Sequence, residues 1–166
     1  MARNYTVQTK ILRPVAEVFD AIVSRDKLCR YFTDVASGDM EEGEQIDWHW
    51  SHYHATLPVV VEKIEPNRLI RLTLDSGAWG KTTTEAYAVA VIFEFEELDD
   101  GSTMLSISEE GWKTDADGLK GSHSNCGGWS HMATCLKAWI EHGIDLRLAA
   151  ASLVPRVLVD CRNGKP

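Results

Sequence analysis

The chain contains no uninterrupted apolar run of the ~18 residues that a membrane-spanning helix requires. Residues 1–5 lack the apolar core of a secretion signal, so we expect no such signal. The four cysteines, Cys29, Cys126, Cys135 and Cys161, are scattered and form no Cys-x-x-Cys pair. These absences predict a cytoplasmic protein with reduced thiols and no membrane span.

Positive charge is also scarce. The chain has 17 basic and 25 acidic residues, a net charge of −8 and a pI near 5.2. Such a surface repels phosphate backbones, so we expect no nucleic-acid partner. The glycines between 118 and 128 do not follow a strand in a phosphate-binding pattern, and there is no Gly-x-Ser-x-Gly elbow. We therefore predict no cofactor.

The composition is that of an ordinary globular protein, with 44% hydrophobic and 25% charged residues. A length of 166 residues suits one domain with a sizeable core. We expect that domain to span residues 1–147 and to be followed by an extension, 148–166, whose role stays open.

The longest regular element predicted lies near the C-terminal end. Trp129, Met132, Leu136 and Ile140 recur at helical spacing and predict one buried face. The residues of this helix expected to face water are Ser130, Lys137, Glu141 and Asp145. We expect the helix to start near Gly127-Gly128, with Ser124 or Asn125 as its cap, after a polar loop over 114–125.

The remaining pattern is mostly alternating and predicts a run of strands. The expected strands cover 5–13, 45–51, 56–64, 68–74 and a hairpin from 87 to 109 that turns at 99–102. Pro14 should open a short helix, with a second over 27–32. Pro58 predicts an edge position or a bulge. This order predicts an α+β protein whose curved antiparallel sheet of six to seven strands wraps the long C-terminal helix.

Several ordered patterns together resemble a known superfamily. They are Pro14–Ile22 followed by Leu28 and Tyr31-Phe32, then Glu62–Leu69, the Phe93–Gly111 hairpin, and Gly128-Trp129 opening the last helix. Over residues 5–145 the chain resembles the START/Bet v 1-like (SRPBCC) superfamily, in the branch of homologues of the activator of the heat-shock-protein-90 ATPase.

The resemblance implies a helix-grip fold with an apolar cavity between the sheet and the terminal helix. Most small proteins of this kind are understood as binders of hydrophobic small molecules or have no assigned activity. Some relatives act as cyclases or dehydratases, and the eukaryotic namesake stimulates a chaperone ATPase. The family offers no invariant catalytic motif to transfer.

Strand parity and helical spacing direct a set of mostly aromatic side chains toward the gap between sheet and helix. These candidates for ligand binding are Trp48, Trp50, Tyr87, Phe93, Trp112, Trp129 and Met132. The competing interpretation is that each is an ordinary core residue, since aromatic stripes usually only pack.

Glu109 is a further ligand-binding candidate and the one candidate for catalysis. It shares strand parity with Leu105 and Ile107, so it should point inward near the mouth of the cavity. A carboxylate there would have a raised pKa or a hydrogen-bonding partner, and would orient a ligand or act as a general acid or base. The alternative is that the strand ends earlier and leaves Glu109 in water.

Histidines and cysteines invite a metal hypothesis. His52 and His54 lie two apart, while His123-x-x-Cys126 and His131-x-x-x-Cys135 have spacings that zinc can use. No third ligand is placed by the sequence, so we predict no metal and expect solvent-facing or hydrogen-bonded histidines. Pairing these cysteines and histidines as a nucleophilic site has no motif to support it.

Three functions follow. The first is non-catalytic binding of a hydrophobic or aromatic small molecule by a monomer or homodimer. The second is an enzyme that uses Glu109, with Tyr87 or His54, for proton transfer on a cyclic ketone or polyketide-like substrate. The third is an interaction protein that modulates a chaperone or another partner through its acidic surface. The resemblance ranks the first above the others.

Overall fold

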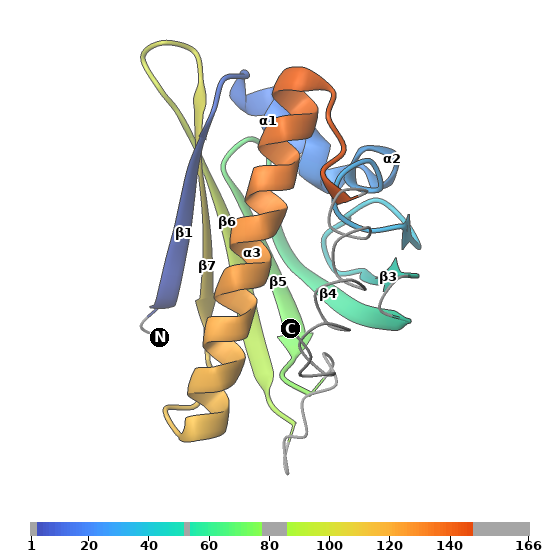
Figure 1. Ribbon diagram of the computed structural model, residues 1–166, viewed down its shortest axis with the longest axis vertical. Coiled ribbons are helices and arrows are strands. Elements are labelled where there is room, and N and C mark those ends of the chain that lie inside the picture. Colours follow the sequence, from blue (N-terminus) through green and yellow to red (C-terminus); the bar gives the residue numbers. More distant parts are fainter. Residues whose placement is uncertain (1–2, 52–53, 78–85, 148–166) are drawn as a thin grey trace, which may run out of the picture.

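The computed structural model describes residues 3–51, 54–77 and 86–147 of the chain (Figure 1). The predicted extension, 148–166, lies outside these residues. In chain order the elements are β1 (Arg3–Ile11), α1 (Val15–Val23), α2 (Arg25–Leu28), β2 (Val35–Ala36), β3 (Gln45–Trp50), β4 (Ala55–Glu65), β5 (Leu69–Asp75), β6 (Ala88–Glu97), β7 (Thr103–Glu110) and α3 (Ala116–His142).

The strands form one antiparallel sheet of seven, in the order β1-β7-β6-β5-β4-β3-β2. Figure 1 shows α3 crossing one face of the curved sheet, with α1 and α2 near the end of α3. This arrangement confirms the predicted α+β helix-grip fold. Among the described residues, no helix combines the length and hydrophobicity needed to cross a membrane.

Alternation along the strands places the core as predicted. On β3, Ile46, Trp48 and Trp50 are buried, whereas Gln45 and Asp47 between them are exposed. On β7, the inward side chains of Thr103, Leu105, Ile107 and Glu109 are all fully buried. The core therefore lies between the concave face of the sheet and the helices, where apolar side chains leave water.

The largest correction concerns α3, which begins at Ala116 and not near Gly127. Asp115 is its N-cap, because its Oδ1 accepts from the Gly118 backbone N–H at 2.7 Å. The predicted loop over 114–125 and its caps at Ser124 or Asn125 are therefore wrong. The buried face runs on toward the N-terminus through small and polar residues, Gly118, Gly121, Ser122 and Asn125, which an apolar pattern does not detect.

Smaller differences affect the first helices and Pro58. Pro14 is the N-cap of α1 rather than its first residue, and α2 is a single turn that ends at Leu28. Pro58 lies on the inner strand β4, opposite Asp47 of β3. The pairing of β4 with β5 starts only at Val60, so Pro58 lies where the missing N–H costs no bond of that ladder.

The C-terminal end of β1 is bonded to the last turns of α3. Lys137 Nζ donates to the Lys10 carbonyl at 2.6 Å, and the Leu12 N–H donates to Glu141 Oε1 at 2.6 Å. The side chain of Glu141 is only 4% exposed, so its predicted position in water is wrong. These bonds supply partners to two backbone groups at the end of an edge strand.

Candidate ligand-binding site

Glu109 is fully buried at the inward end of β7. It lies opposite Tyr5 on β1 and Val91 on β6, in the layer between the sheet and α3. The predicted inward orientation is therefore what the structure shows. A carboxylate at this depth requires several hydrogen-bond donors to offset the loss of water.

Three N–H donors supply that need. Asn125 Nδ2 donates to Glu109 Oε1 at 3.0 Å, and Trp129 Nε1 donates to the same oxygen at 2.7 Å. Trp112 Nε1 donates to Oε2. Two of the donors come from α3 and one from the loop after β7, so the carboxylate ties the helix to the sheet.

Two glycines place Trp112 under the helix. Gly111, at φ +101, turns the chain after β7, a conformation that side chains rarely adopt. At Gly121 of α3, a Cβ atom would lie 2.4 Å from the Trp112 ring. The absence of a side chain there lets the indole pack against the helix and aim its N–H at Glu109.

Tyr5 completes this polar end. Its buried hydroxyl oxygen lies beside the Glu109 carboxylate. Burial, with the neighbouring Glu109 carboxylate, raises the pKa of the Tyr5 hydroxyl far above its usual value. The hydroxyl therefore keeps its proton at neutral pH.

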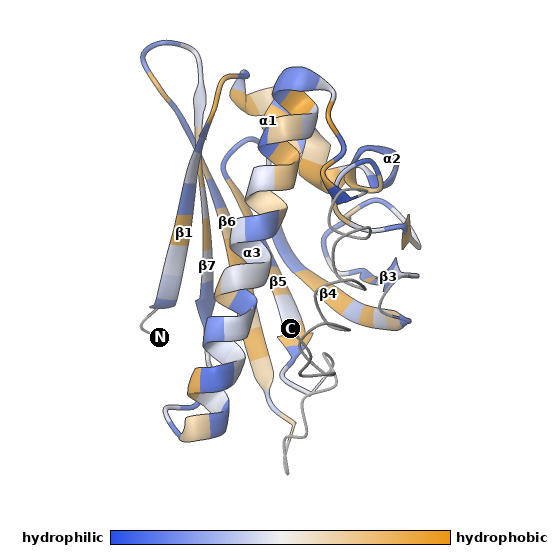
Figure 2. Ribbon diagram, in the orientation of Figure 1, coloured by the Kyte–Doolittle hydropathy of each residue, from blue (hydrophilic) through white to orange (hydrophobic). Residues whose placement is uncertain are grey.

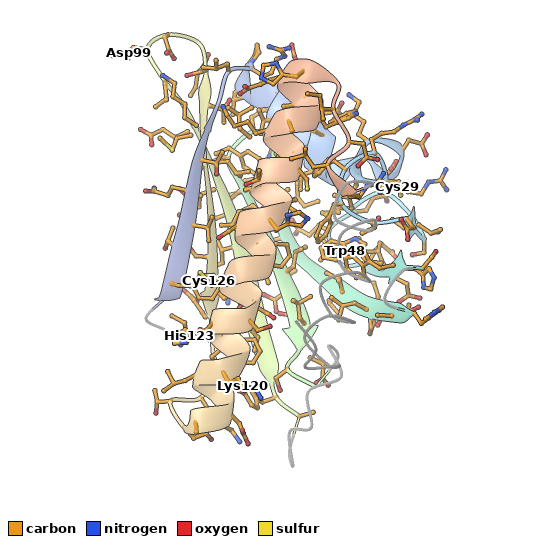
Figure 3. The ribbon with its side chains drawn as sticks, in the orientation of Figure 1. Cys29, Trp48, Asp99, Lys120, His123 and Cys126 are labelled. Carbon is orange, nitrogen blue, oxygen red and sulfur yellow. The ribbon has the colours of Figure 1, made fainter. Side chains whose placement is uncertain are left out.

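An aromatic cluster adjoins the polar end. It consists of Phe32, Trp48, Trp50, Phe93 and Trp129, whose neighbouring rings have centroids 5.2 to 6.4 Å apart. Trp129 belongs to both groups, because its N–H reaches Glu109 while its ring packs against Trp48 and Phe93. In the view of Figure 3, Trp48 lies on the β3–β4 side of α3 and Cys126 on its β1 side.

The two tryptophans of β3 differ in their polar atoms. Trp50 Nε1 donates to the Phe32 carbonyl at 2.8 Å. Trp48 is fully buried, and its Nε1 has no acceptor within the described part of the chain. Buried indole N–H groups usually find a partner, so Trp48 stands out within the cluster.

A family model that matches most of the chain assigns the protein to a family. The model of the family described as Activator of Hsp90 ATPase homolog 1-like protein matches residues 13–141. The chain belongs to this family. The predicted branch of the superfamily is thereby confirmed.

Solved structures share the family's fold. Protein SSP2350 from Staphylococcus saprophyticus is 27% identical, with 86% of this chain and 94% of that chain covered and a TM-score of 0.70. The Aha1 dimer from Colwellia psychrerythraea is 18% identical over 86% and 98%, with a TM-score of 0.68. CalU16 from Micromonospora echinospora is 18% identical over 89% and 80%, with a TM-score of 0.65. No curated protein matches the chain.

Of the predicted site residues, the structure brings Trp48, Trp50, Phe93 and Trp129 into one cluster and joins Trp112 to Glu109. Met132 is buried on α3. Tyr87 precedes β6 instead of lying on it, is half-buried, and packs edge-on against the Trp112 ring with centroids 6.1 Å apart. The predicted use of these residues in ligand binding stays a prediction.

Sequence reasoning missed three residues of the site: Tyr5, Phe32 and Asn125. Tyr5 lies in the predicted strand over 5–13, but its neighbour on β7 depends on strand register. Asn125 was assigned to a loop because a buried amide carries no apolar signal.

No described histidine or cysteine bonds to Glu109, although Cys126 lies near Tyr5. His54 is exposed in the turn before β4, whereas Glu109 is buried, and His52 lies outside the described residues. On α3, His131 Nε2 and Cys135 Sγ are 3.5 Å apart, and burial raises the pKa of the Cys135 thiol. Within the ranges that the structure describes, no three His, Cys, Asp or Glu side chains converge to hold a metal ion.

Proposed function

We propose that the protein binds a hydrophobic or aromatic small molecule between the sheet and α3 without catalysing a reaction on it. The observation that carries this proposal is the buried N–H of Trp48, which lies among aromatic rings without an acceptor in the described residues. An unsatisfied buried donor costs about 1–3 kcal/mol. A bound molecule that presents an acceptor to Trp48 would offset that cost.

The surroundings of Glu109 favour an orienting role over proton transfer. Its two oxygens already accept from three N–H groups, so the carboxylate is held in one orientation. A general base would need its oxygen within hydrogen-bond reach of a substrate proton. Fixed polar groups beside aromatic walls are typical of binding sites that select one orientation of a ligand.

The test is calorimetric titration with lipids, flavonoids and polyketide-like aromatics. We expect at least one class to bind, and Trp48→Phe to weaken that binding roughly tenfold through loss of one hydrogen bond. Trp139→Phe is the matched control, because the Trp139 ring stacks on Tyr31, outside the aromatic cluster, with ring centroids 5.6 Å apart. No heat from any class would overturn the proposal. Equal affinities of wild type and Trp48→Phe would remove Trp48 from the site.

The small molecule is the one partner proposed. A cytoplasmic location, the lack of a nucleic-acid partner and a monomeric or homodimeric state stay predictions of the sequence. The Colwellia relative is described as a dimer, and that description applies to that protein.

A further inference from the structure

Phe32 is the partly exposed member of the aromatic cluster. It is half-buried, whereas the other four rings of the cluster are buried: Trp48, Trp50, Phe93 and Trp129. The centroid of the Phe32 ring lies 5.3 Å from that of Trp48 and 5.2 Å from that of Trp50. It lies 5.8 Å from the centroid of the Trp129 ring. The Phe32 ring therefore separates three buried indoles from water.

Side-chain donors hold the backbone around Phe32 in place. Arg147 donates from Nη1 to the Thr33 carbonyl at 2.7 Å and from Nη2 to the Arg30 carbonyl at 3.0 Å. Trp50 Nε1 donates to the carbonyl of Phe32 itself at 2.8 Å. Rotation of the Phe32 side chain about its own bonds breaks none of these hydrogen bonds. The ring can therefore turn outward while the backbone stays where it is.

The neighbouring indoles are fixed independently of the Phe32 ring. Trp129 is held by its bond to Glu109 at 2.7 Å, and Trp50 by its bond to the Phe32 carbonyl. An outward turn of the ring thus frees a space of about one phenyl ring between indoles that keep their positions. Trp48, which packs against that ring, has a buried N–H without an acceptor in the described residues. A phenyl ring has no lone pair to offer to such a donor.

From these contacts we propose that the ligand takes the place of the Phe32 ring, which turns outward to admit it. The ligand is then a planar aromatic molecule that carries a hydrogen-bond acceptor for Trp48. It exchanges ring contacts with the three indoles for those that Phe32 made, so no open cavity is required beforehand. The wild-type affinity is lower than the intrinsic affinity of the site, because only molecules with Phe32 turned outward can bind. This inference rests on the proposed function and names the place and the class of its ligand.

The first experiment is calorimetric titration with acetophenone, a single planar ring with one carbonyl acceptor. Phe32→Ala leaves the space of the ring open in advance, as in engineered apolar cavities that bind benzene. We therefore expect acetophenone to bind Phe32→Ala about tenfold more tightly than the wild type. Adding Trp48→Phe to Phe32→Ala should weaken that binding roughly tenfold, because the N–H donor is lost.

Phe19→Ala is the matched control, because it removes the same ring outside the cluster. The Phe19 ring packs edge-on against Phe95, with centroids 5.4 Å apart. Any acetophenone that enters the cavity left in Phe19→Ala should bind equally well with and without Trp48→Phe. A loss of affinity in both backgrounds would show that Trp48 does not act through the space of Phe32.

The second experiment follows the Phe32 ring in the otherwise unaltered protein. The ring is labelled as 4-fluorophenylalanine and observed by fluorine NMR in H2O and in D2O. Saturation with acetophenone should increase the difference between the two solvents toward that of the urea-unfolded chain, because the ring has moved into water. A ring that stays in the cluster as a fixed wall keeps its small difference.

The outcomes separate this inference from the proposed function. If acetophenone binds Phe32→Ala no more tightly than the wild type, or the labelled ring stays shielded, Phe32 is a fixed wall and the inference fails. The proposed function then stands as long as the wider panel contains a ligand. If Phe32→Ala does not fold, the labelled ring decides alone. If acetophenone binds none of these proteins the inference fails, and if no panel molecule binds either, both proposals fail.

Discussion

Along α3, residues 116–128 approach the sheet with glycine, serine and asparagine, whereas residues 129–142 do so mainly with apolar side chains. The first half is held by Asn125, which donates to Glu109, and by the contact of Gly121 with Trp112. The second half buries Met132 and Leu136. In Figure 2 the lower turns of the helix carry several blue and white segments.

The comparison shows two ways of docking one helix. Apolar burial scales with area and tolerates small shifts of the helix. Hydrogen bonds, and the close packing of a ring against a glycine, require one fixed position of the helix. Both interactions weaken steeply when the helix shifts. The first half of α3 therefore lies beside the buried carboxylate of Glu109, whose orientation matters for the proposed site. It supplies Asn125 as one of the donors to that carboxylate.

The largest loss of stability should come from removing the Glu109 carboxylate, which holds the first half of α3. Glu109→Ala leaves three buried N–H groups without their acceptor, each worth about 1–3 kcal/mol, so we expect a loss of about 3–5 kcal/mol in the free energy of unfolding. Urea denaturation measures this loss. Glu109→Gln should cost less, because one oxygen still accepts.

Hydrogen exchange separates the two halves. Leu136→Ala should cost a similar amount, about 2–5 kcal/mol, but through a cavity in the second half. We expect Glu109→Ala to lower amide protection mainly over 116–128 and Leu136→Ala to lower it over 129–142. Equal loss of protection along the whole helix in both variants would contradict the division of α3.

A smaller effect is expected at Gly121. In Gly121→Ala the new Cβ atom would meet the Trp112 ring at 2.4 Å, so the indole must move and lose its bond to Glu109. We expect a loss of about 1–3 kcal/mol in the free energy of unfolding, as for other overpacked sites. The near-ultraviolet circular dichroism of the tryptophans should change with it. An unchanged spectrum and midpoint would show that Trp112 is not fixed by this contact.

The sequence predicted the elements whose buried face is apolar. Alternation placed Trp48 and Trp50 on the inward face of β3, and strand parity alone placed Glu109 inward. The same reasoning failed for residues 116–125, because Gly118, Gly121, Ser122 and Asn125 keep the helical period but not its hydrophobicity. A search for small and polar residues at that period, with Asp115 as a cap, would have found the first half of α3.

The polar end of the site was only half predictable for a different reason. Tyr5 and Glu109 are far apart in the sequence, and they meet because β1 pairs with β7 in one particular register. A shift of that register by one residue would turn one of the two side chains away. Local patterns fix the face of each strand, but not which residues of two distant strands lie opposite each other.

The smallest predicted effect has the opposite sign and occurs in the same helix. Gly127 is exposed on α3, and a Cβ atom built there meets nothing within 4 Å. Gly127→Ala should therefore raise the free energy of unfolding by about 0.5–1 kcal/mol, because alanine loses less backbone freedom on forming a helix. The measurement is again urea denaturation, with Gly121→Ala as the matched substitution. If Gly127→Ala destabilises the protein as much as Gly121→Ala does, the contact with Trp112 is not what distinguishes the two positions.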